Sequence, residues 1–475
     1  MKNSKLFTLF KALNTRERTR FRHYVQSPFF NKHRGVLALL DAISPLPDQA
    51  NKMDIWQQAF PNQPYHEAHL NNLLSDMLQL LYDFLAYQKY ESDAHLAREL
   101  LIDALLEREQ FKDAAYQLKR QRQLLEKSPQ QSFGYFLDCA QLEQQADTYQ
   151  LSLQKRYFTS YLQSESDYLD LFYLCNKLRI ACDMANRNSI IEASYDCRHL
   201  DKLLSWPIDE DTFPAVRVYK QALSMLSHRD DESHYHQFRA ALAQNIACFP
   251  AAERRTLFTY ALNYCIQKIN IGKSQYYREA FGLYKDMLEG GTLLINQALS
   301  PWAYKNIITA GIRLQEFEWT EKFIQTYQTF LPDKDRDNAL AYNLAAFYYA
   351  LKDYKKALLQ LQDVEFTDPS YYLGAKFIQL KSFYELGEYE AYFSMIEAFR
   401  KYVDRSSTLS VYRKKTLKRF LLVAKKAGLL YVEKPTLKAM DWQAKITELE
   451  TQLEASQEVA NKDWLQEILG RLRAE

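Results

Sequence analysis

The chain of 475 residues carries 61 basic and 59 acidic side chains, so its formal net charge is +2 and no global field draws it to nucleic acid or anionic lipid. Its six cysteines include no Cys-x-x-Cys pair, so neither a zinc knuckle nor a thioredoxin-type redox site is indicated. No stretch approaches the roughly 18 uncharged apolar residues that a membrane-spanning helix requires, so we expect a cytoplasmic protein without membrane insertion.

Apolar residues recur at helical spacing along almost the whole chain, and prolines separate the periodic segments. Alternation of the kind that marks a β-strand is almost absent. One helical stripe consists of Leu70, Leu73, Leu74, Met77, Leu78, Leu81 and Leu85. We therefore predict an all-α protein of roughly 20 to 24 helices.

Residues 1–92 form the first predicted region, an N-terminal helical domain or cap. Short paired helices flank residues 26–32, and a long helix is expected from about residue 66 to residue 89. The region resembles the start of a group of uncharacterised bacterial helical-repeat proteins, in the residues Leu13-Asn14-Thr15-Arg16-Glu17-Arg18 through Ser27-Pro28-Phe29-Phe30-Asn31. That resemblance implies no activity.

Four arginines alternate along one predicted helix of this region: Arg16, Arg18, Arg20 and Arg22. They flank an apolar stripe on both sides, which offers two rows of positive charge to phosphate or to an acidic protein. Arginines that snorkel around an ordinary core-facing stripe explain the same pattern.

Residues 93–290 are predicted to form divergent helical-hairpin repeats. Around the turn at residues 109–112, the apolar pattern of one hairpin is complete, with Leu101, Ile102, Leu105, Phe111, Ala114 and Leu118. From about residue 130 to residue 290 the helical rhythm continues without a recognisable repeat motif.

Three segments carry side chains typical of active sites, but none completes a motif. Gly272-Lys273-Ser274 ends like a phosphate-binding loop, yet Gln267 stands where that loop needs a glycine. His66 and His69 are three positions apart, whereas the zinc-protease helix needs four. Residues 228–236 contain three histidines and three carboxylates. The simplest interpretation of this segment is a polar turn between helices. We therefore expect no catalytic residue, no metal, no cofactor and no enzyme activity.

Residues 291–430 contain a turn that recurs at a near-constant interval, with an aromatic residue at Phe317, Tyr354 and Tyr389. Around the middle turn, the 34-residue consensus of tetratricopeptide repeats is matched by Asn343, Leu344, Ala345, Tyr348, Asp353, Tyr354, Ala357 and Pro369. In the neighbouring units, Thr320 and Tyr392 replace the close-packing alanine. The region therefore resembles a tetratricopeptide array, which implies hairpins stacked as a right-handed superhelix, or solenoid, with Pro369 ending the second helix of the middle unit.

In tetratricopeptide arrays the first helix of each pair lines a concave groove that holds a protein or peptide. By resemblance, the inward positions fall on aromatic and basic residues: Trp302, Lys305, Arg313, Tyr342, Tyr349, Phe377, Lys381 and Tyr384. This mixture suits an extended or helical peptide that carries acidic groups. The carboxylate clamp of the family is incomplete, because Thr309, Gly374 and Ile378 replace its other polar residues.

A second basic cluster lies on a predicted helix at residues 409–427, which we expect to end before Gly428. The face opposite its apolar stripe carries Lys414, Lys415, Lys418, Arg419, Lys425 and Lys426. A solvated helix face and a nucleic-acid site both fit this pattern. Residues 431–475 are predicted to form two amphipathic capping helices, with Trp442, Ile446, Leu449 and Leu453 on one and Trp464, Ile468, Leu469 and Leu472 on the other.

The leading hypothesis is a non-catalytic helical-repeat scaffold or adaptor that binds a protein or peptide in the concave groove. The alternative is a nucleic-acid-associated or regulatory repeat protein that uses the basic faces at residues 16–22 and 414–426. The sequence leaves open which partner is bound, in which process, and in what oligomeric state.

Overall fold

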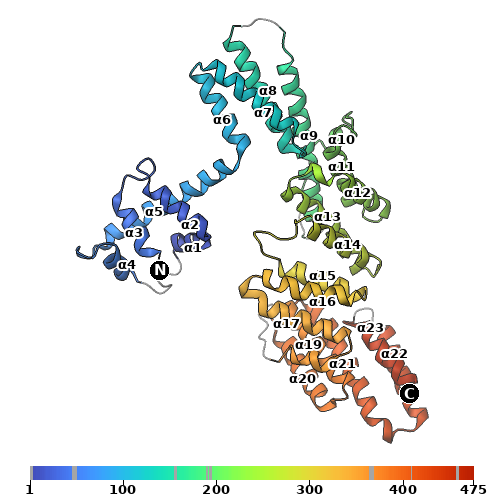
Figure 1. Cartoon of the computed structure of the whole chain (residues 1–475). Helices are drawn as coiled ribbons and strands as arrows, with labels where there is room; N and C mark the ends of the chain where they lie inside the picture. The colour runs from blue at the N-terminus through green and yellow to red at the C-terminus, as the bar shows by residue number, and fades with distance from the viewer. Residues whose placement is uncertain are drawn as a thin grey trace. The chain divides into compact units, whose positions relative to one another are not determined.

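The computed structural model describes residues 4–44, 51–154, 158–188, 191, 195–362, 369–407, 409–455 and 459–474 (Figure 1). Over these residues the chain forms 23 α-helices, three short 3-10 helices and no strand, and one isolated antiparallel bridge joins Ile295 and Ala298. The prediction of an all-α protein is confirmed, and the number of helices lies within the predicted range.

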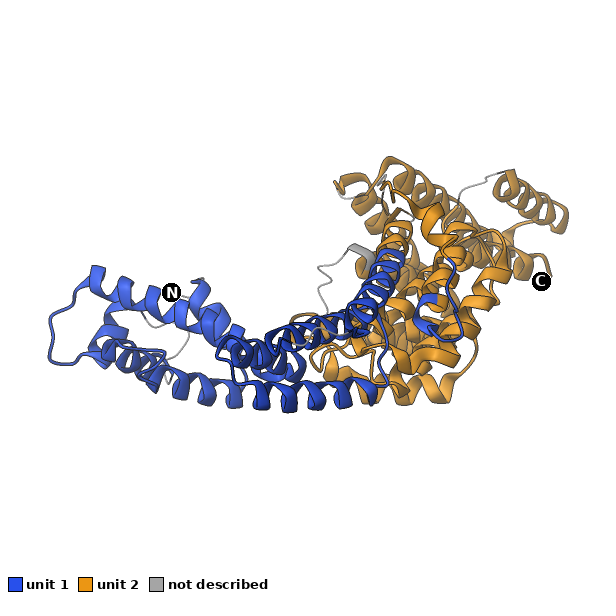
Figure 2. Cartoon of the chain, turned by 90° about the horizontal axis from the view of Figure 1, so that it is seen from above, with its two compact units in different colours: residues 1–179, 207–216 blue, residues 180–206, 217–475 orange. Residues whose placement is uncertain are grey.

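Two compact units divide the chain (Figure 2). The first comprises residues 1–179 with 207–216, and the second comprises residues 180–206 with 217–475. The four regions predicted from the sequence follow changes of motif rather than compactness, and their boundaries stay predictions.

The first unit begins with a helical core in which α5 packs against the four helices before it. Two of its helices start at capping boxes, because Asn14 and Asn51 each exchange hydrogen bonds with an acidic residue three positions later. The long helix expected at residues 66–89 is α5. The helices of the unit are α1 (Lys5–Ala12), α2 (Thr15–Gln26), α3 (Arg34–Ile43), α4 (Lys52–Ala59), α5 (Glu67–Ser92), α6 (Ala94–Glu107), α7 (Phe111–Glu126), α8 (Phe133–Ser152) and most of α9 (Tyr161–Asn188).

Helices α6, α7 and α8 pack on one another in the same unit. Arg122 on α7 donates two hydrogen bonds to the carboxylate of Glu143 on α8, at 2.5 and 3.1 Å. Because Glu143 is buried, this pair satisfies a carboxylate that would otherwise be costly inside the protein. Gln145 of α8 reaches α6, where its amide donates to the Glu99 carbonyl at 3.0 Å and to Asp103 at 2.6 Å.

The second unit is built from helices that pack in sequence-adjacent pairs, including α15 with α16, α17 with α18 and α19 with α20. The first helices of these pairs also pack side by side, α15 on α17 and α17 on α19. Its helices are α10 (Leu200–Leu204), α11 (Pro214–Ser227), α12 (Glu232–Asn245), α13 (Ala251–Asn270), α14 (Tyr276–Glu289), α15 (Pro301–Arg313), α16 (Phe317–Tyr327), α17 (Asp333–Ala350), α18 (Tyr354–Leu359), α19 (Pro369–Glu385), α20 (Tyr389–Arg405), α21 (Val411–Glu433), α22 (Ala439–Ala455) and α23 (Lys462–Ala474). Of these, α11 begins within residues assigned to the first unit.

The recurring turn has one backbone geometry wherever the sequence predicts it. Three residues connect the two helices of each pair, and the middle one has a left-handed backbone conformation. Its φ is 56° at Glu109, 61° at Gln315, 63° at Lys352 and 73° at Gly387. The next N–H then donates to the carbonyl five positions earlier, at 2.9, 2.9, 2.9 and 3.0 Å respectively. This helix ending satisfies a carbonyl that would otherwise be free, and it turns the chain into the second helix of the pair.

Two boundaries differ from the predictions. Helix α21 does not end before Gly428 but continues to Glu433, because this glycine packs inside the unit rather than ending the helix. Pro369 does not end the second helix of the middle unit: α18 ends at Leu359, and Pro369 is the first residue of α19. A proline suits that position, since the first N–H groups of a helix have no intrahelical partner.

The two C-terminal helices expected from the sequence are α22 and α23. All eight apolar residues predicted to form their inner stripes are buried. These residues belong to the same core as the apolar side chains of α19, α20 and α21. The C-terminal helices therefore share one core with α19, α20 and α21.

Candidate binding surface

The predicted groove residues lie on three first helices that pack side by side. Helix α15 carries Trp302, Lys305 and Arg313, α17 carries Tyr342 and Tyr349, and α19 carries Phe377, Lys381 and Tyr384. In the structure, most of these residues lie in one of two environments. One group forms an aromatic cluster at the start of α15, and another lies beneath the C-terminal helices.

The aromatic cluster surrounds the ammonium group of Lys305. Its Nζ atom lies 5.4 Å from the ring centre of Trp302, 5.1 Å from that of Tyr342 and 5.3 Å from that of Tyr371. Trp302 is 53% exposed, so its ring is available to a partner. Each cation–π contact contributes about 0.5–1 kcal/mol at such a site, which holds Lys305 among the rings.

Tyr371 belongs to this cluster, although the consensus positions did not identify it. Its hydroxyl donates to the Pro301 carbonyl at 3.1 Å, and its ring meets that of Tyr342 edge-on at 5.1 Å. The signal that could have found it is the aromatic pair Tyr371-Tyr372 near the start of α19.

Tyr342 has a structural role in addition to its place in this cluster. Burial raises the pKa of its hydroxyl above the ordinary value. Its ring lies directly against Gly374 of α19, where an added Cβ atom would overlap the ring. The glycine that breaks the carboxylate-clamp pattern therefore makes room for Tyr342 between α17 and α19.

Phe377 and Tyr384 face later helices of the same chain, Phe377 toward α20 and α21 and Tyr384 toward α23. The ring of Phe377 lies 5.3 Å from Phe399 and 5.0 Å from Phe420 between centres, within the core. Tyr384 meets Trp464 of α23 edge-on at 5.5 Å. These positions are thus occupied by residues of the same chain.

Lys381 also contacts α23 and Asn461, the residue that precedes this helix. Its Nζ donates to the Oδ1 atom of Asn461 at 2.5 Å and lies 5.6 Å from the ring centre of Trp464. Burial lowers the pKa of this ammonium group to about 8, and the positive charge of Arg313 acts in the same direction. The nearby acidic residues Glu467 and Asp463 oppose that shift.

Tyr349 and Arg313 lie toward the α23 end of the surface, since Tyr349 interacts electrostatically with Glu385 and Arg313 with Lys381. Burial raises the pKa of Tyr349, and the Glu385 carboxylate adds to that effect. The Tyr349 ring lies 5.5 Å from Tyr354. Arg313 is exposed at the last turn of α15.

Most basic residues of α2 form hydrogen bonds or ion pairs within their own unit. Arg18 donates to the carbonyls of Leu13 and Lys11 at 2.9 and 3.1 Å. Arg20 pairs with Glu91, and Arg22 pairs with Asp41 at 3.0 Å, while Arg16 is exposed. These contacts hold α2 against its neighbours, as expected of arginines around a core-facing stripe.

The basic face of α21 is also partly neutralised. Lys418 pairs with Asp404 at 2.5 Å, Lys425 pairs with Glu397 at 2.9 Å, and Lys426 donates to Gln452 at 3.0 Å. Lys415 is exposed, and Lys414 and Arg419 are half-buried. Three of the six side chains thus link α21 to α20 and α22, and the two ion pairs, of Lys418 and Lys425, reduce the charge that the face offers to nucleic acid.

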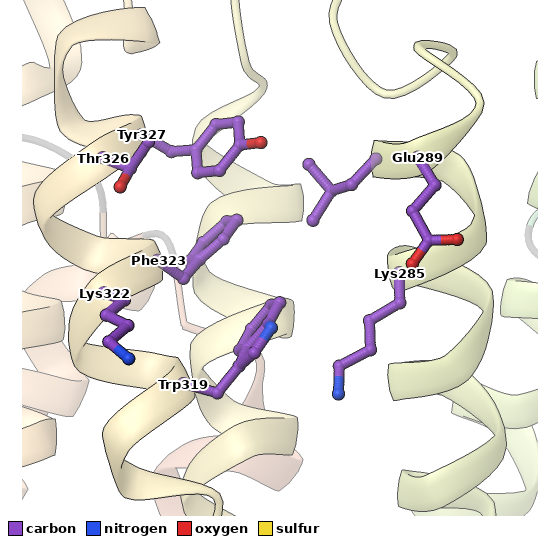
Figure 3. A pocket seen from close by; sticks show the side chains of 8 residues that line it. Lys285, Glu289, Trp319, Lys322, Phe323, Thr326 and Tyr327 are labelled. Atoms are coloured by element: carbon purple, nitrogen blue, oxygen red, sulfur yellow. The ribbon is translucent and has the colours of Figure 1, made fainter.

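A hollow of about 410 Å³ lies between α14 and α16, on the second helices of two pairs (Figure 3). Three aromatic side chains four positions apart, Trp319, Phe323 and Tyr327, form a stacked ladder along one wall. Lys285 and Glu289 lie on the opposite wall. The inward-facing consensus positions omit this surface, although the four-residue spacing of the aromatic side chains is visible in the sequence.

Two buried cysteines and two neighbouring histidines carry titratable groups of the kind that reactions use. Burial raises the pKa of the Cys139 and Cys265 thiols to about 12, so both stay protonated and unreactive near neutral pH. His228 and His234 have ring centres 5.0 Å apart beside Asp231. No group of three metal-binding side chains occurs among the residues that the structure describes.

None of the helices described is both long and apolar enough to span a bilayer. Comparison of the chain with protein-family models, curated proteins and solved structures returned no match.

Proposed function

We propose that this chain is a non-catalytic helical-repeat scaffold that binds a protein segment along α15, α17 and α19, as tetratricopeptide arrays do. The observation that carries the proposal is the occupation of α19 by a helix of the same chain. Lys381 and Tyr384, selected from the sequence as peptide-binding positions, contact α23 or the residue before it through a hydrogen bond and ring contacts. A surface that holds one amphipathic helix has the chemistry to hold a partner segment.

The repeated turn geometry and the packing of first helices on one another also support this proposal. The α15 end of the surface offers an exposed tryptophan, Trp302, above a lysine held by aromatic rings. Aromatic anchors of this kind carry most of the binding energy in many interfaces. We therefore expect a partner to bury Trp302.

A variant with Trp302→Ala and Arg313→Glu tests the proposal. Both side chains are exposed, so the fold should survive while capture of the partner from native cells falls by about tenfold or more, because loss of a hot-spot residue typically costs about 2 kcal/mol or more. Quantitative mass spectrometry of affinity-purified complexes measures the change. The matched control is Lys355→Ala with Leu359→Ala, two exposed positions on α18, the second helix of its pair. Equal recovery of the same proteins by the wild type and both variants would contradict the proposal.

A further inference from the structure

We propose that α23 occupies a helix-binding site that accepts a similar amphipathic helix from a partner protein when α23 is released. This inference rests on the proposed function, since it names the kind of partner that the α19 end of the surface binds. The α23 site is defined here as Lys381, Tyr384 and Glu385 of α19 with Phe420 of α21. Apolar contacts, polar contacts and an unpaired buried group in this site support the inference.

The apolar part of the α23 site receives one tryptophan. Trp464 is only 6% exposed and lies 5.5 Å from Tyr384 and 6.0 Å from Phe420 between ring centres. The apolar residues that follow it on α23 are also buried: Leu465, Ile468, Leu469 and Leu472. A ligand helix therefore needs a large aromatic residue followed by aliphatic residues one, four, five and eight positions later.

Polar contacts at both ends of α23 determine its register and direction. Before the helix begins, Asn461 accepts a hydrogen bond from Lys381 at 2.5 Å. Near its C-terminus, Arg471 donates to both carboxylate oxygens of Glu385, at 2.6 and 2.8 Å. Ten residues of helix span about 15 Å, so these two contacts bracket the apolar stripe. A ligand helix would carry a basic residue seven positions after its aromatic anchor.

One buried polar group at this interface is left without a hydrogen bond. The indole Nε1 of Trp464 has no partner among the described residues. Burying an unpaired donor is unfavourable. A foreign helix whose aromatic anchor has no N–H, or whose N–H finds an acceptor, would therefore bind better than α23 itself.

Because α23 is part of the chain, it competes with any partner at high effective concentration. A segment tethered by a short linker acts at roughly millimolar concentration. A free helix that binds the vacant site with a Kd of about 10 μM would therefore bind the occupied site about 100-fold more weakly. This competition makes the inference measurable with the intact chain.

The experiment uses a fluorescent peptide of residues 459–474 and the full-length chain. Leu465→Ser with Ile468→Ser in the protein loosens the resident helix, and circular dichroism checks that the rest stays folded. Fluorescence anisotropy should show that the peptide binds this loosened chain about 100-fold more tightly than the wild type. A peptide with the same two serine substitutions is the matched control and should not bind.

A charge exchange tests the register. Adding Glu385→Arg to the loosened chain should abolish binding of the natural peptide, and the Arg471→Glu peptide should restore it. If the folded, loosened chain binds the peptide no better than the wild type does, or if the charge exchange changes nothing, α23 is a permanent cap and the inference fails. That result would leave the proposed function to the test at Trp302, whose ring contacts are with Lys305 and Tyr371 rather than with α23.

Discussion

Replacing Gly428 with valine should destabilise the second unit by about 3 kcal/mol, because the substitution overpacks a core that cannot adjust. A Cβ atom at Gly428 would lie 2.6 Å from Cε1 of Tyr392 and 3.4 Å from Cε1 of Phe393. Tyr392 is fully buried, and its hydroxyl donates to the Ala424 carbonyl at 2.7 Å, so its ring has nowhere to move. Urea unfolding followed by circular dichroism measures the loss.

The matched control is Gly470→Ala on α23, where nothing lies within 4 Å of an added Cβ atom. Alanine favours a helix over glycine by up to about 1 kcal/mol, so this variant should be slightly more stable. Adding Tyr392→Leu to Gly428→Val should recover part of the lost stability, since the smaller side chain frees space. Similar unfolding midpoints for the wild type and Gly428→Val would show that the close contact is not a constraint.

This packing gives a physical reason for the two residues that differ from the tetratricopeptide consensus beside the middle turn. From the sequence, Thr320 and Tyr392 are replacements of the close-packing alanine. In the structure, each larger residue faces a glycine on an adjacent helix, Gly311 for Thr320 and Gly428 for Tyr392. In each pair, the larger side chain on one helix is compensated by a glycine on the other, so the total side-chain volume at the contact changes little. A consensus compares single positions, so it does not detect such compensation between two helices.

Replacing Lys381 with methionine should stabilise the protein near neutral pH, and the gain should disappear as the pH approaches 10. The folded pKa of Lys381 is about 8, against an ordinary value of 10.5. Between these values the unfolded chain binds more protons than the folded chain, so wild-type stability rises with pH there. At lower pH the ammonium group stays charged and buried, at a cost on the order of 2 kcal/mol after allowance for its partial exposure.

Urea midpoints of the wild type and Lys381→Met, measured from pH 7 to pH 10, check this prediction. Tyrosines and cysteines titrate in both proteins, so the difference between the two curves isolates Lys381. Methionine has no hydrogen bond to offer Asn461, which reduces the expected gain to about 1 kcal/mol at pH 7. A difference that stays constant over this pH range would show that Lys381 does not lose its proton as described.

Local features of the helical hairpins could be predicted from the sequence because they depend on short-range chemistry. The recurring turns, the long helix α5 and the two C-terminal helices follow from apolar spacing and from the turn residues. The left-handed positions at Gln315 and Lys352 show why a glycine is not required there: the hydrogen bond across the helix end compensates for the conformation.

The surroundings of the predicted site residues could not be predicted, because they depend on contacts between distant segments. Lys381 and Asn461 are 80 positions apart, and Arg471 and Glu385 are 86 positions apart. No local pattern indicates that a C-terminal helix covers α19. Likewise, the ion pairs of Arg22 with Asp41 and of Lys425 with Glu397 become visible only when the helices are placed side by side.

The most direct test of the proposed binding surface is site-specific photo-crosslinking in native cells. A benzophenone amino acid replaces Trp302 in one full-length chain and Leu359, exposed on a second helix, in another. We expect one dominant crosslinked protein from position 302, its loss when Arg313→Glu is added, and no such product from position 359. Equal products from both positions, or none from position 302 in a folded chain, would contradict this expectation.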